Sequence, residues 1–160
     1  MLTCDVREAV ESDVAHMAAL DSAVGMNPWS AERHRAVCAA GVSDSESALV
    51  AHAGATLVGF IVMSCIADEG EIRNLAVAPA RQRQGVGRSL VRAALLRMVA
   101  RGVNRCYLEV RASNRRAQNL YTAVGFHTSG ERRDYYTTPE GREDALLMAL
   151  NIQDYIRRKQ

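Results

Sequence analysis

The order of strand-like and helix-like segments along this 160-residue chain predicts an α/β fold, a single domain in which one mixed sheet is covered by helices. Two stretches carry the prediction. Residues 71–101 run from a strand through a glycine-bearing loop into a long helix with one apolar face. Apolar runs at 48–53 and 56–66 flank Gly54, as in a β-hairpin. The remaining segments fit around this centre, so no second domain is needed.

Before the hairpin, the pattern predicts one strand and two helices. Residues 3–8 alternate between apolar and polar, which is typical of a strand. Ser12 or Asp13 is expected to cap the first helix, and Ser30 the second. The stretch 41–47 is small and polar, so we expect a loop there.

The central unit, residues 71–101, has the features of an anion-binding loop. Pro79 ends its strand, because proline has no N–H to donate to a neighbouring strand. Gly85 and Gly87 carry no Cβ, so the backbone can approach a ligand closely. Gly102 stands where a left-handed cap should end the helix. Free N–H groups and the positive end of the helix dipole then point at one spot. The apolar face of the helix is formed by Leu90, Val91, Ala94, Leu95 and Met98.

Two other glycine-loop families do not fit this loop. A dinucleotide-binding fingerprint needs a third glycine, but Arg88, Ser89 and Leu90 follow the second one. A nucleotide-hydrolase phosphate loop needs Gly-Lys-Ser/Thr, and Lys159 is the only lysine of the chain. The remaining pattern is Gln-x-x-Gly-x-Gly after a strand that ends in Leu-Ala-Val. A strand-to-helix turn that simply needs glycine is the alternative.

After the central helix, the pattern predicts a strand at 105–110 and a helix that begins at Asn114 and ends at Gly125. Two more strands, at 126–136 and 144–150, then flank a polar turn. These elements complete the α/β sheet.

Composition and charge limit the classes of function. A net charge of +2 gives no global field that favours nucleic acid, so we expect no direct nucleic-acid partner. No apolar run reaches the length of a membrane span, and the first residues lack a signal-peptide pattern. We therefore expect a cytoplasmic protein with no membrane contact. We place the domain at 1–150 and expect the polar tail, 151–160, to be loosely held.

Cysteines and histidines are scattered, without a Cys-x-x-Cys pair or a ligand cluster. Cys65 and Cys106 fall within apolar strand-like runs, where a thiol behaves as a small hydrophobe. We therefore expect no metal site and no disulfide.

Two motifs resemble the GCN5-related N-acetyltransferase (GNAT) superfamily. One is the Gln-x-x-Gly-x-Gly loop at 82–87. The other is Asn-x-x-Ala-x-x-Leu-Tyr-x-x-x-Gly-Phe at 114–126. The resemblance implies a GNAT fold, with a single, mostly antiparallel mixed sheet and a central βα unit that binds a pyrophosphate. It also implies an enzyme that uses acetyl-CoA as co-substrate.

Further motifs resemble the bacterial ribosomal-protein-alanine N-acetyltransferases (RimI type). They are Leu-Glu-Val-Arg-Ala-Ser-Asn at 108–114, Asn-Pro-Trp-Ser at 27–30, Arg-Arg-Asp-Tyr-Tyr at 132–136 and Gly-Arg-Glu-Asp-Ala at 141–145. That family acetylates the N-terminal alanine of a ribosomal protein, the eighteenth of the small subunit. The implied partner is the N-terminal segment of such a protein. Met26-Asn27 departs from the apolar or aromatic residue expected there, which leaves the substrate open.

Acetyl transfer to an amine needs a base for the amine proton and a donor for the departing thiolate. The resemblance assigns these roles to Glu109, acting directly or through water, and to Tyr121. Glu109 stands among apolar strand residues, and burial there would make it a stronger base. The alternatives are an ion pair between Glu109 and Arg111, and simple core packing of Tyr121. A phenol is a weaker acid than a thiol, so Tyr121 can act chiefly as a hydrogen-bond donor.

For acetyl-CoA, the resemblance implies that the loop N–H groups hold the pyrophosphate and that the central strand pairs with the pantetheine arm. The expected binding residues are Leu75, Ala76, Val77, Arg83, Gln84, Gly85, Val86, Gly87, Arg88 and Asn114. For the acceptor, we expect Trp29, Tyr135 and Tyr136 to wall a slot for the first peptide residues. Ordinary packing of these aromatics is the alternative.

Three other functions compete with N-terminal acetylation. An acetyltransferase for a small-molecule amine, such as a polyamine, would use the same glycine loop. A regulatory module could bind acetyl-CoA without turnover, although it would need neither Glu109 nor Tyr121. The hypothesis of a nucleic-acid binder rests only on scattered arginines. The fold alone does not separate these functions.

Overall fold

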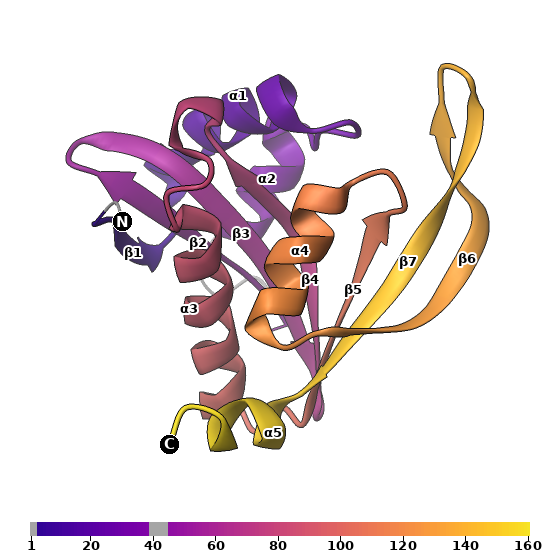
Figure 1. Ribbon diagram of the computed structural model, residues 1–160. Coiled ribbons are helices and arrows are strands. Elements are labelled where there is room, and N and C mark those ends of the chain that lie inside the picture. The colour runs from indigo at the N-terminus through magenta and orange to yellow at the C-terminus, as the bar shows by residue number, and fades with distance from the viewer. Residues whose placement is uncertain (1–2, 39–44) are drawn as a thin grey trace.

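A seven-stranded sheet in the order β1-β2-β3-β4-β5-β7-β6 forms the centre of the computed structural model, which describes residues 3–38 and 45–160 (Figure 1). Neighbouring strands are antiparallel except β4 and β5, which are parallel. The predicted α/β class and the mostly antiparallel mixed sheet are therefore confirmed. The strands are β1 (Asp5–Glu8), β2 (Glu46–Ala53), β3 (Thr56–Ile66), β4 (Glu69–Val77), β5 (Arg105–Arg111), β6 (His127–Thr138) and β7 (Gly141–Asn151).

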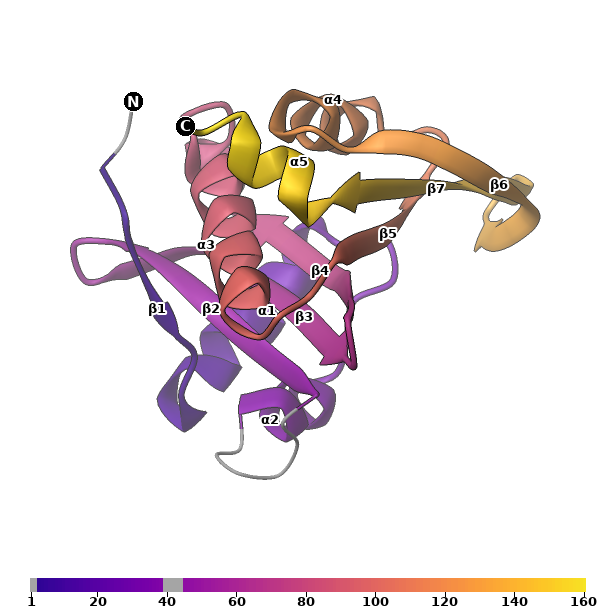
Figure 2. The same cartoon turned by 90° about the horizontal axis from the view of Figure 1, so that it is seen from below.

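Helices cover both faces of the sheet (Figure 2). One face packs against α1 and α2, and the other against α3, α4 and α5. The helices are η1 (Glu11–Asp13), α1 (Val14–Val24), α2 (Ala31–Cys38), η2 (Pro79–Arg81), α3 (Val86–Ala100), α4 (Arg115–Val124) and α5 (Ile152–Arg157). In the described part of the chain, no helix combines the length and apolar character of a membrane span.

The central βα unit folds as the sequence predicts. β4 ends before Pro79, and α3 begins directly after Gly85. Gly102 follows α3 in the left-handed conformation expected of a cap, with φ of 76°. The predicted apolar face of α3, which includes Leu90 and Met98, is fully buried against the sheet. A parallel connection through a helix explains why β4 and β5 alone run in the same direction.

β4 and β5 pair only over their first residues. The register runs from Glu69 opposite Arg105 to Ile72 opposite Leu108. A bulge then shifts the pairing of β4 with β3 between Val62 and Met63. From there the two strands diverge (Figure 1). β4 stays paired with β3 as far as Val77, so its backbone edge toward β5 is left without a strand partner.

Several predicted boundaries and one cap are wrong in detail. The acidic turn is shorter than expected, because β4 already begins at Glu69. β6 and β7 continue to Thr138 and Gly141, since backbone pairing needs no apolar periodicity. The loop predicted at 41–47 lies largely outside the described residues, and Glu46 belongs to β2. Asp13 begins α1, but its carboxylate accepts hydrogen bonds from Val10 N and Arg7 instead of capping the helix.

The expectation of a loosely held tail is also wrong. Residues 152–157 form α5, with Ile152 and Tyr155 buried in the core beneath α3. The side chain of Asn151 caps this helix by accepting from the backbone N–H groups of Gln153 and Asp154. Apolar residues at 152, 155 and 156 supply an i, i+3, i+4 face, which is short but enough for one helical turn to dock.

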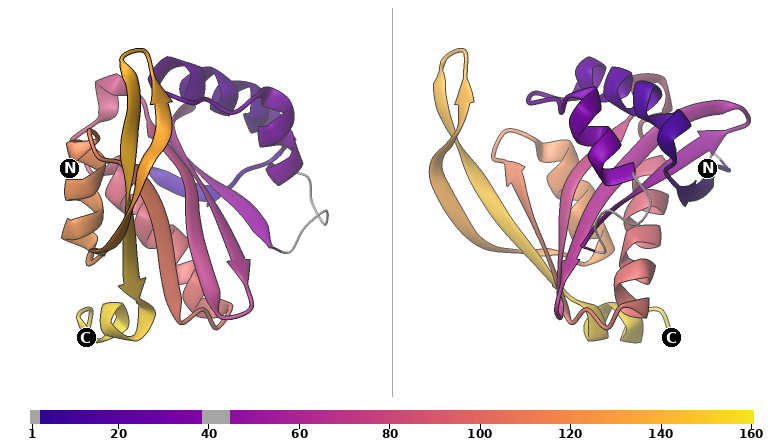
Figure 3. Two further views of the ribbon diagram at one scale, coloured as in Figure 1. Left: turned by 90° about the vertical axis from the view of Figure 1, so that its right-hand side faces the viewer. Right: turned by 180° about the vertical axis from the view of Figure 1, so that it is seen from behind.

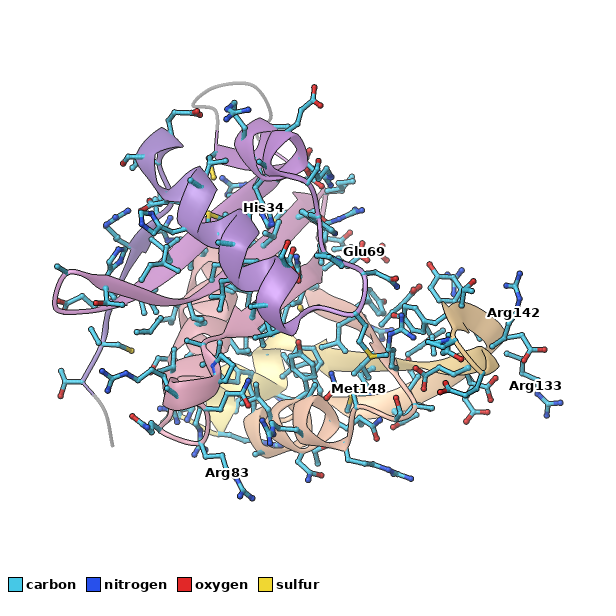
Figure 4. All side chains as sticks on the ribbon, turned by 90° about the horizontal axis from the view of Figure 1, so that it is seen from above. His34, Glu69, Arg83, Arg133, Arg142 and Met148 are labelled. Atoms are coloured by element: carbon cyan, nitrogen blue, oxygen red, sulfur yellow. The ribbon has the colours of Figure 1, made fainter. Side chains whose placement is uncertain are left out.

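The β6–β7 hairpin extends well beyond the rest of the sheet (Figure 3). Its register shifts between Arg132 and Tyr136, and Asp134 has a left-handed φ of 52° at this bend. Figure 4 shows Arg133 and Arg142 at the outer end of the hairpin. The bend brings the inner part of the hairpin beside the end of β5.

Candidate active site

A cavity of about 600 Å³ opens where β4 and β5 diverge, between the glycine loop and α4. β4 contributes the edge that lacks a strand partner, and the N-terminal end of α4 closes the other side. Most of the residues expected to bind acetyl-CoA line this cavity. They are Leu75, Ala76, Val77, Arg83, Gly85, Gly87, Arg88 and Asn114.

The glycine loop presents its backbone to the cavity. Gly85 is left-handed, with φ of 89°, at the position that begins α3. A Cβ on Gly87 would lie 3.1 Å from Leu120 Cδ2 across the cavity, so a larger residue would fill the space. Within the described residues, no hydrogen bond uses the N–H groups of 83–88. These groups, together with the positive end of α3, can hold a pyrophosphate.

The other two residues of the expected set do not line the cavity. Val86 is buried in the core. Gln84 uses its side chain to donate to Ala80 O at 3.0 Å. Gln82, which is not among the expected binding residues, also lines the cavity and donates to Val77 O at 3.1 Å, tying the loop to the end of β4. Its place as the first residue of Gln-x-x-Gly-x-Gly was the available signal.

Asn114 begins α4, as predicted. Its Oδ1 accepts from Ala117 N at 3.1 Å, which satisfies one of the free N–H groups of the helix. Asn114 also lines the cavity, so capping and ligand binding are compatible roles for this one side chain.

A second cavity, of about 240 Å³, adjoins the first. It contains both expected catalytic residues, Glu109 and Tyr121, together with Tyr136. Further walls come from the α1–α2 loop and from the middle of β4. The two cavities share lining residues, namely Val24, Leu75, Ala76, Asn114 and Ala117. A molecule held along β4 in the first cavity can therefore reach into the second, which we call the acceptor cavity.

Glu109 lies among polar neighbours, which corrects the expectation of apolar surroundings. Its side chain is 24% exposed, and Oε1 lies 3.2 Å from Arg132 Nε. A hydrogen bond to this carboxylate raises the pKa of Tyr135. The alternative, an ion pair of Glu109 with Arg111, is absent from the pairs of the described residues, because Arg111 Nη1 binds Glu143 Oε1 at 2.8 Å. Glu109 is thus held by the β6–β7 hairpin.

Tyr121 is buried and lines the acceptor cavity. Its ring packs edge-on against Phe126, with 5.6 Å between ring centroids. Burial raises the pKa of the Tyr121 phenol, and Cys106 and Tyr136 add to the rise. The phenol therefore keeps its proton over the neutral range and can donate a hydrogen bond.

Arg111 connects four segments at the wall of the acceptor cavity. Its guanidinium lies 4.2 Å from the ring centroid of Tyr136 and binds Glu143 on β7. With its amide oriented to suit its neighbours, Asn27 accepts from Arg111 Nη2 at 2.7 Å and donates to Met26 O. Arg111 therefore fixes the α1–α2 loop against the hairpin, a role that the sequence did not reveal.

The three aromatics expected to wall a peptide slot are separated. Tyr136 lines the acceptor cavity. Tyr135 is 46% exposed on the hairpin, next to Glu109 and outside the cavity lining. Trp29 lies in neither cavity, and it packs between Arg33, at 4.2 Å, and His34, at 5.5 Å between ring centroids. The alternative of ordinary packing fits Trp29.

Two further residues of the acceptor cavity, Asp21 and Asn74, were not foreseen either. Asp21 lies within α1 and Asn74 within β4, and neither belongs to a recognisable motif. Among residues 3–38 and 45–160, no group of three or more His, Cys, Asp or Glu side chains is arranged to hold a metal ion.

The sequence is similar to that of known proteins. Residues 14–126 match the acetyltransferase (GNAT) family. The [ribosomal protein bS18]-alanine N-acetyltransferase of Escherichia coli (strain K12) is 45% identical over 96 residues, which are 60% of this chain and 65% of that protein. The match thus spans less than two thirds of this curated relative.

Solved structures share the fold over a longer span. The ribosomal-protein-S18-alanine N-acetyltransferase from Escherichia coli superposes with a TM-score of 0.85 at 31% identity, covering 94% of each chain. Arabidopsis thaliana NAA60, solved in complex with acetyl-CoA, gives a TM-score of 0.83 at 17% identity, over 94% of this chain and 99% of that chain. The similarity to NAA60 supports the shared fold alone.

Proposed function

Because the chain belongs to the acetyltransferase (GNAT) family, we propose that it transfers the acetyl group of acetyl-CoA to the free N-terminal amine of a protein. The proposed substrate begins with alanine and is a ribosomal protein of the bS18 kind. One observation carries the proposal. The loop cavity, which suits a pyrophosphate, adjoins a smaller cavity that contains a carboxylate and a protonated phenol.

Acetyl-CoA fits the residues of the first cavity by its chemistry. The N–H groups of 83–88 suit the pyrophosphate, and Arg83 and Arg88 add positive charge. Figure 4 shows Arg83 extending away from the body of the protein at this end. The edge of β4 offers Leu75 to Val77 as a partner for an extended amide-bearing arm. Bound acetyl-CoA supplies a thioester as the acetyl donor.

Glu109 is the proposed base for the acceptor amine, acting directly or through a water molecule. A peptide α-amine has a pKa of about 8, so a fair share of it is already neutral at pH 7 and a modest base is enough. The ion pair with Arg132 keeps the Glu109 carboxylate in place beside the cavity. Glu109 accepts the proton that the amine loses as its nitrogen bonds to the acetyl carbon.

Tyr121 is the proposed donor to the departing thiolate. The raised pKa of this phenol means that the proton is present over the whole neutral range. Even an unperturbed phenol is a weaker acid than a thiol by about 2 kcal/mol, and burial weakens the Tyr121 phenol further, so full proton transfer is uphill by more than that. The role that suits Tyr121 is therefore a hydrogen bond to the charge that develops on sulfur.

The size of the acceptor cavity supports a small first residue. At about 240 Å³, it has room for the amine and a first residue with a small side chain such as alanine. The curated relative named for alanine acetylation of bS18 points the same way. An enzyme of this kind would act in the cytoplasm, where ribosomal proteins are made.

A thiol-release assay with acetyl-CoA and four acceptors tests the proposal. The acceptors are an Ala-Arg-starting peptide, the same peptide with a blocked N-terminus, a blocked peptide that contains lysine, and spermidine. Turnover only with the free Ala-Arg peptide is the expected result. Turnover with spermidine alone would replace the protein substrate by a small amine. Tight acetyl-CoA binding without turnover on any acceptor would favour a regulatory module.

A further inference from the structure

Asp21 is a buried carboxylate in the last turns of α1. It is only 2% exposed, and one of its oxygens accepts three hydrogen bonds. Oδ2 accepts from the backbone N–H of Trp29 at 2.9 Å, from Nε2 of His34 at 3.0 Å and from Nδ2 of Asn74 at 2.9 Å. These donors come from the α1–α2 loop, α2 and β4. Asp21 therefore ties three segments together at one wall of the acceptor cavity.

His34 contacts the Asp21 carboxylate through one ring nitrogen. A carboxylate only accepts, so Nε2 of His34 carries the proton that it shares with Oδ2. Nδ1 of His34 is buried and has no hydrogen-bond partner in the described part of the chain. The His34 ring therefore meets Asp21 through Nε2 and Oδ2 and leaves the second carboxylate oxygen untouched.

The second oxygen of Asp21, Oδ1, is free on the side of Gly25. Among the hydrogen bonds of residues 3–38 and 45–160, none involves Oδ1. A Cβ on Gly25 would come within 2.6 Å of Oδ1. Gly25 has an ordinary φ of −80° that any residue could adopt. Glycine is needed here because there is no space for a Cβ. Both residues line the acceptor cavity.

The other charged side chains of the acceptor cavity have partners of opposite charge in the described structure. The pairs are Arg73 with Glu46, Arg111 with Glu143, and Glu109 with Arg132. Asp21 is paired through Oδ2 with Nε2 of His34 at 3.0 Å, whereas its Oδ1 has no partner among the hydrogen bonds and ion pairs of the described residues. A buried carboxylate oxygen without a partner attracts a cation, because the interior screens charge poorly.

We propose that Oδ1 of Asp21 binds the α-ammonium group of the acceptor and guides its nitrogen into the cavity beside Glu109. This inference deepens the proposed function and rests on it, since it names the group that recognises a protonated amine. At neutral pH most of a peptide α-amine is protonated and arrives as a cation. The ammonium first loses one proton to water, and the neutral nitrogen becomes positive again as it bonds to the acetyl carbon. Asp21 stabilises this charge as well. Glu109 then accepts the second proton while the C–S bond breaks and the thiolate of CoA leaves.

Asp21→Asn separates this role from a structural one. The amide keeps an oxygen for the three donors and removes the charge that faces the cavity. Asp13→Asn is the matched control, because Asp13 is buried at the other end of the same helical segment and also accepts a backbone N–H. Each protein, saturated with CoA, would be titrated calorimetrically with an Ala-Arg-starting peptide and with its des-amino counterpart, in which hydrogen replaces the amino group.

The wild-type protein and Asp13→Asn should prefer the peptide with the free amine by about tenfold or more, the typical value of a charged hydrogen bond. Asp21→Asn should lose most of this preference while its affinity for the des-amino peptide stays within about threefold. Asp21→Ser, which also keeps one oxygen, replaces it if the asparagine variant does not fold. A preference that survives in these variants, or is absent from the wild type, overturns the proposal. Failure of every acceptor peptide in the thiol-release assay would instead reject the proposed function, even with the binding preference intact.

Discussion

The two cavities that meet at Leu75 and Ala76 are built in different ways. The first is made largely by backbone, from one strand–loop–helix segment and the start of α4. The second is made by side chains from α1, the α1–α2 loop, β4, β5, α4 and β6. A backbone site tolerates changes of most side chains and fails when the backbone loses its space. A side-chain site fails when a single functional group is removed.

The severest test of this difference is Gly87→Trp. The added side chain starts 3.1 Å from Leu120 Cδ2 and must enter the space between the loop and α4. We expect at least a hundredfold loss of acetyl-CoA affinity, measured by calorimetry, since the pyrophosphate cradle is filled. Gln84→Ala is the control, because the Gln84 side chain donates to Ala80 O and does not line the cavity, and its backbone N–H remains. It should change the affinity by less than about threefold. Normal binding by the Gly87 variant would contradict the loop assignment.

The first cavity, which is built largely by backbone, is also the part of the site that the sequence predicts best. Gly85, Gly87 and Pro79 determine local backbone geometry within a few residues, so their positions follow from spacing alone. The acceptor cavity depends on where separate elements meet. Nothing near Glu109 in the chain indicates that Arg132, on the distant hairpin, becomes its partner. Interactions of that kind are set by the register of β5, β7 and β6, which the sequence pattern does not define.

The same distinction explains the other errors. Trp29 is expected to wall the acceptor slot, but in the structure it packs against Arg33 and His34 of α2. Asp21 was overlooked because a single acid in a helix is normally exposed. Only the fold brings His34 and Asn74 to its carboxylate. Contacts between residues so far apart in the chain produce no periodic pattern in the sequence.

Glu109→Gln should lower turnover and leave acetyl-CoA binding intact, whereas the Gly87 variant loses acetyl-CoA binding. The amide keeps the size of the side chain but cannot take a proton, so turnover should fall by about a hundredfold or more. The affinity for acetyl-CoA should be unchanged, because Glu109 does not line the first cavity. Glu131→Gln, an exposed acid on β6, provides the control. Unchanged turnover with an unchanged pH–rate profile would show that Glu109 is not the base.

Tyr121→Phe should have a smaller effect of the same kind. It removes one hydrogen-bond donor and keeps the ring, so kcat should fall by about tenfold while acetyl-CoA binding is preserved. Burial raises the pKa of Tyr121, so the phenol stays protonated as the pH rises and should contribute no alkaline decline of wild-type activity between about pH 6 and 9. Tyr155→Phe, buried in α5, is the control. Equal losses in both variants would assign Tyr121 to packing.

The smallest expected effect is at Asp13, an acid outside both cavities. Arg7 donates to its carboxylate at 2.7 and 2.9 Å, and this interaction lowers the pKa of Asp13 in the folded protein. The folded state therefore binds fewer protons than the unfolded state between the two pKa values. The stabilisation is fully present above the unfolded pKa of about 3.9 and is lost as the pH falls through the folded value.

Asp13→Asn should consequently lower the free energy of unfolding by about 1 kcal/mol at pH 7, since Arg7 is half exposed and water screens the pair. The difference from the wild type, measured by urea denaturation, should shrink as the pH falls below about 4. Turnover should stay at the wild-type level, because neither Asp13 nor Arg7 lines a cavity. A stability difference that is the same at pH 3 and pH 7 would mean that the Asp13 carboxylate acts through its shape and not through its charge.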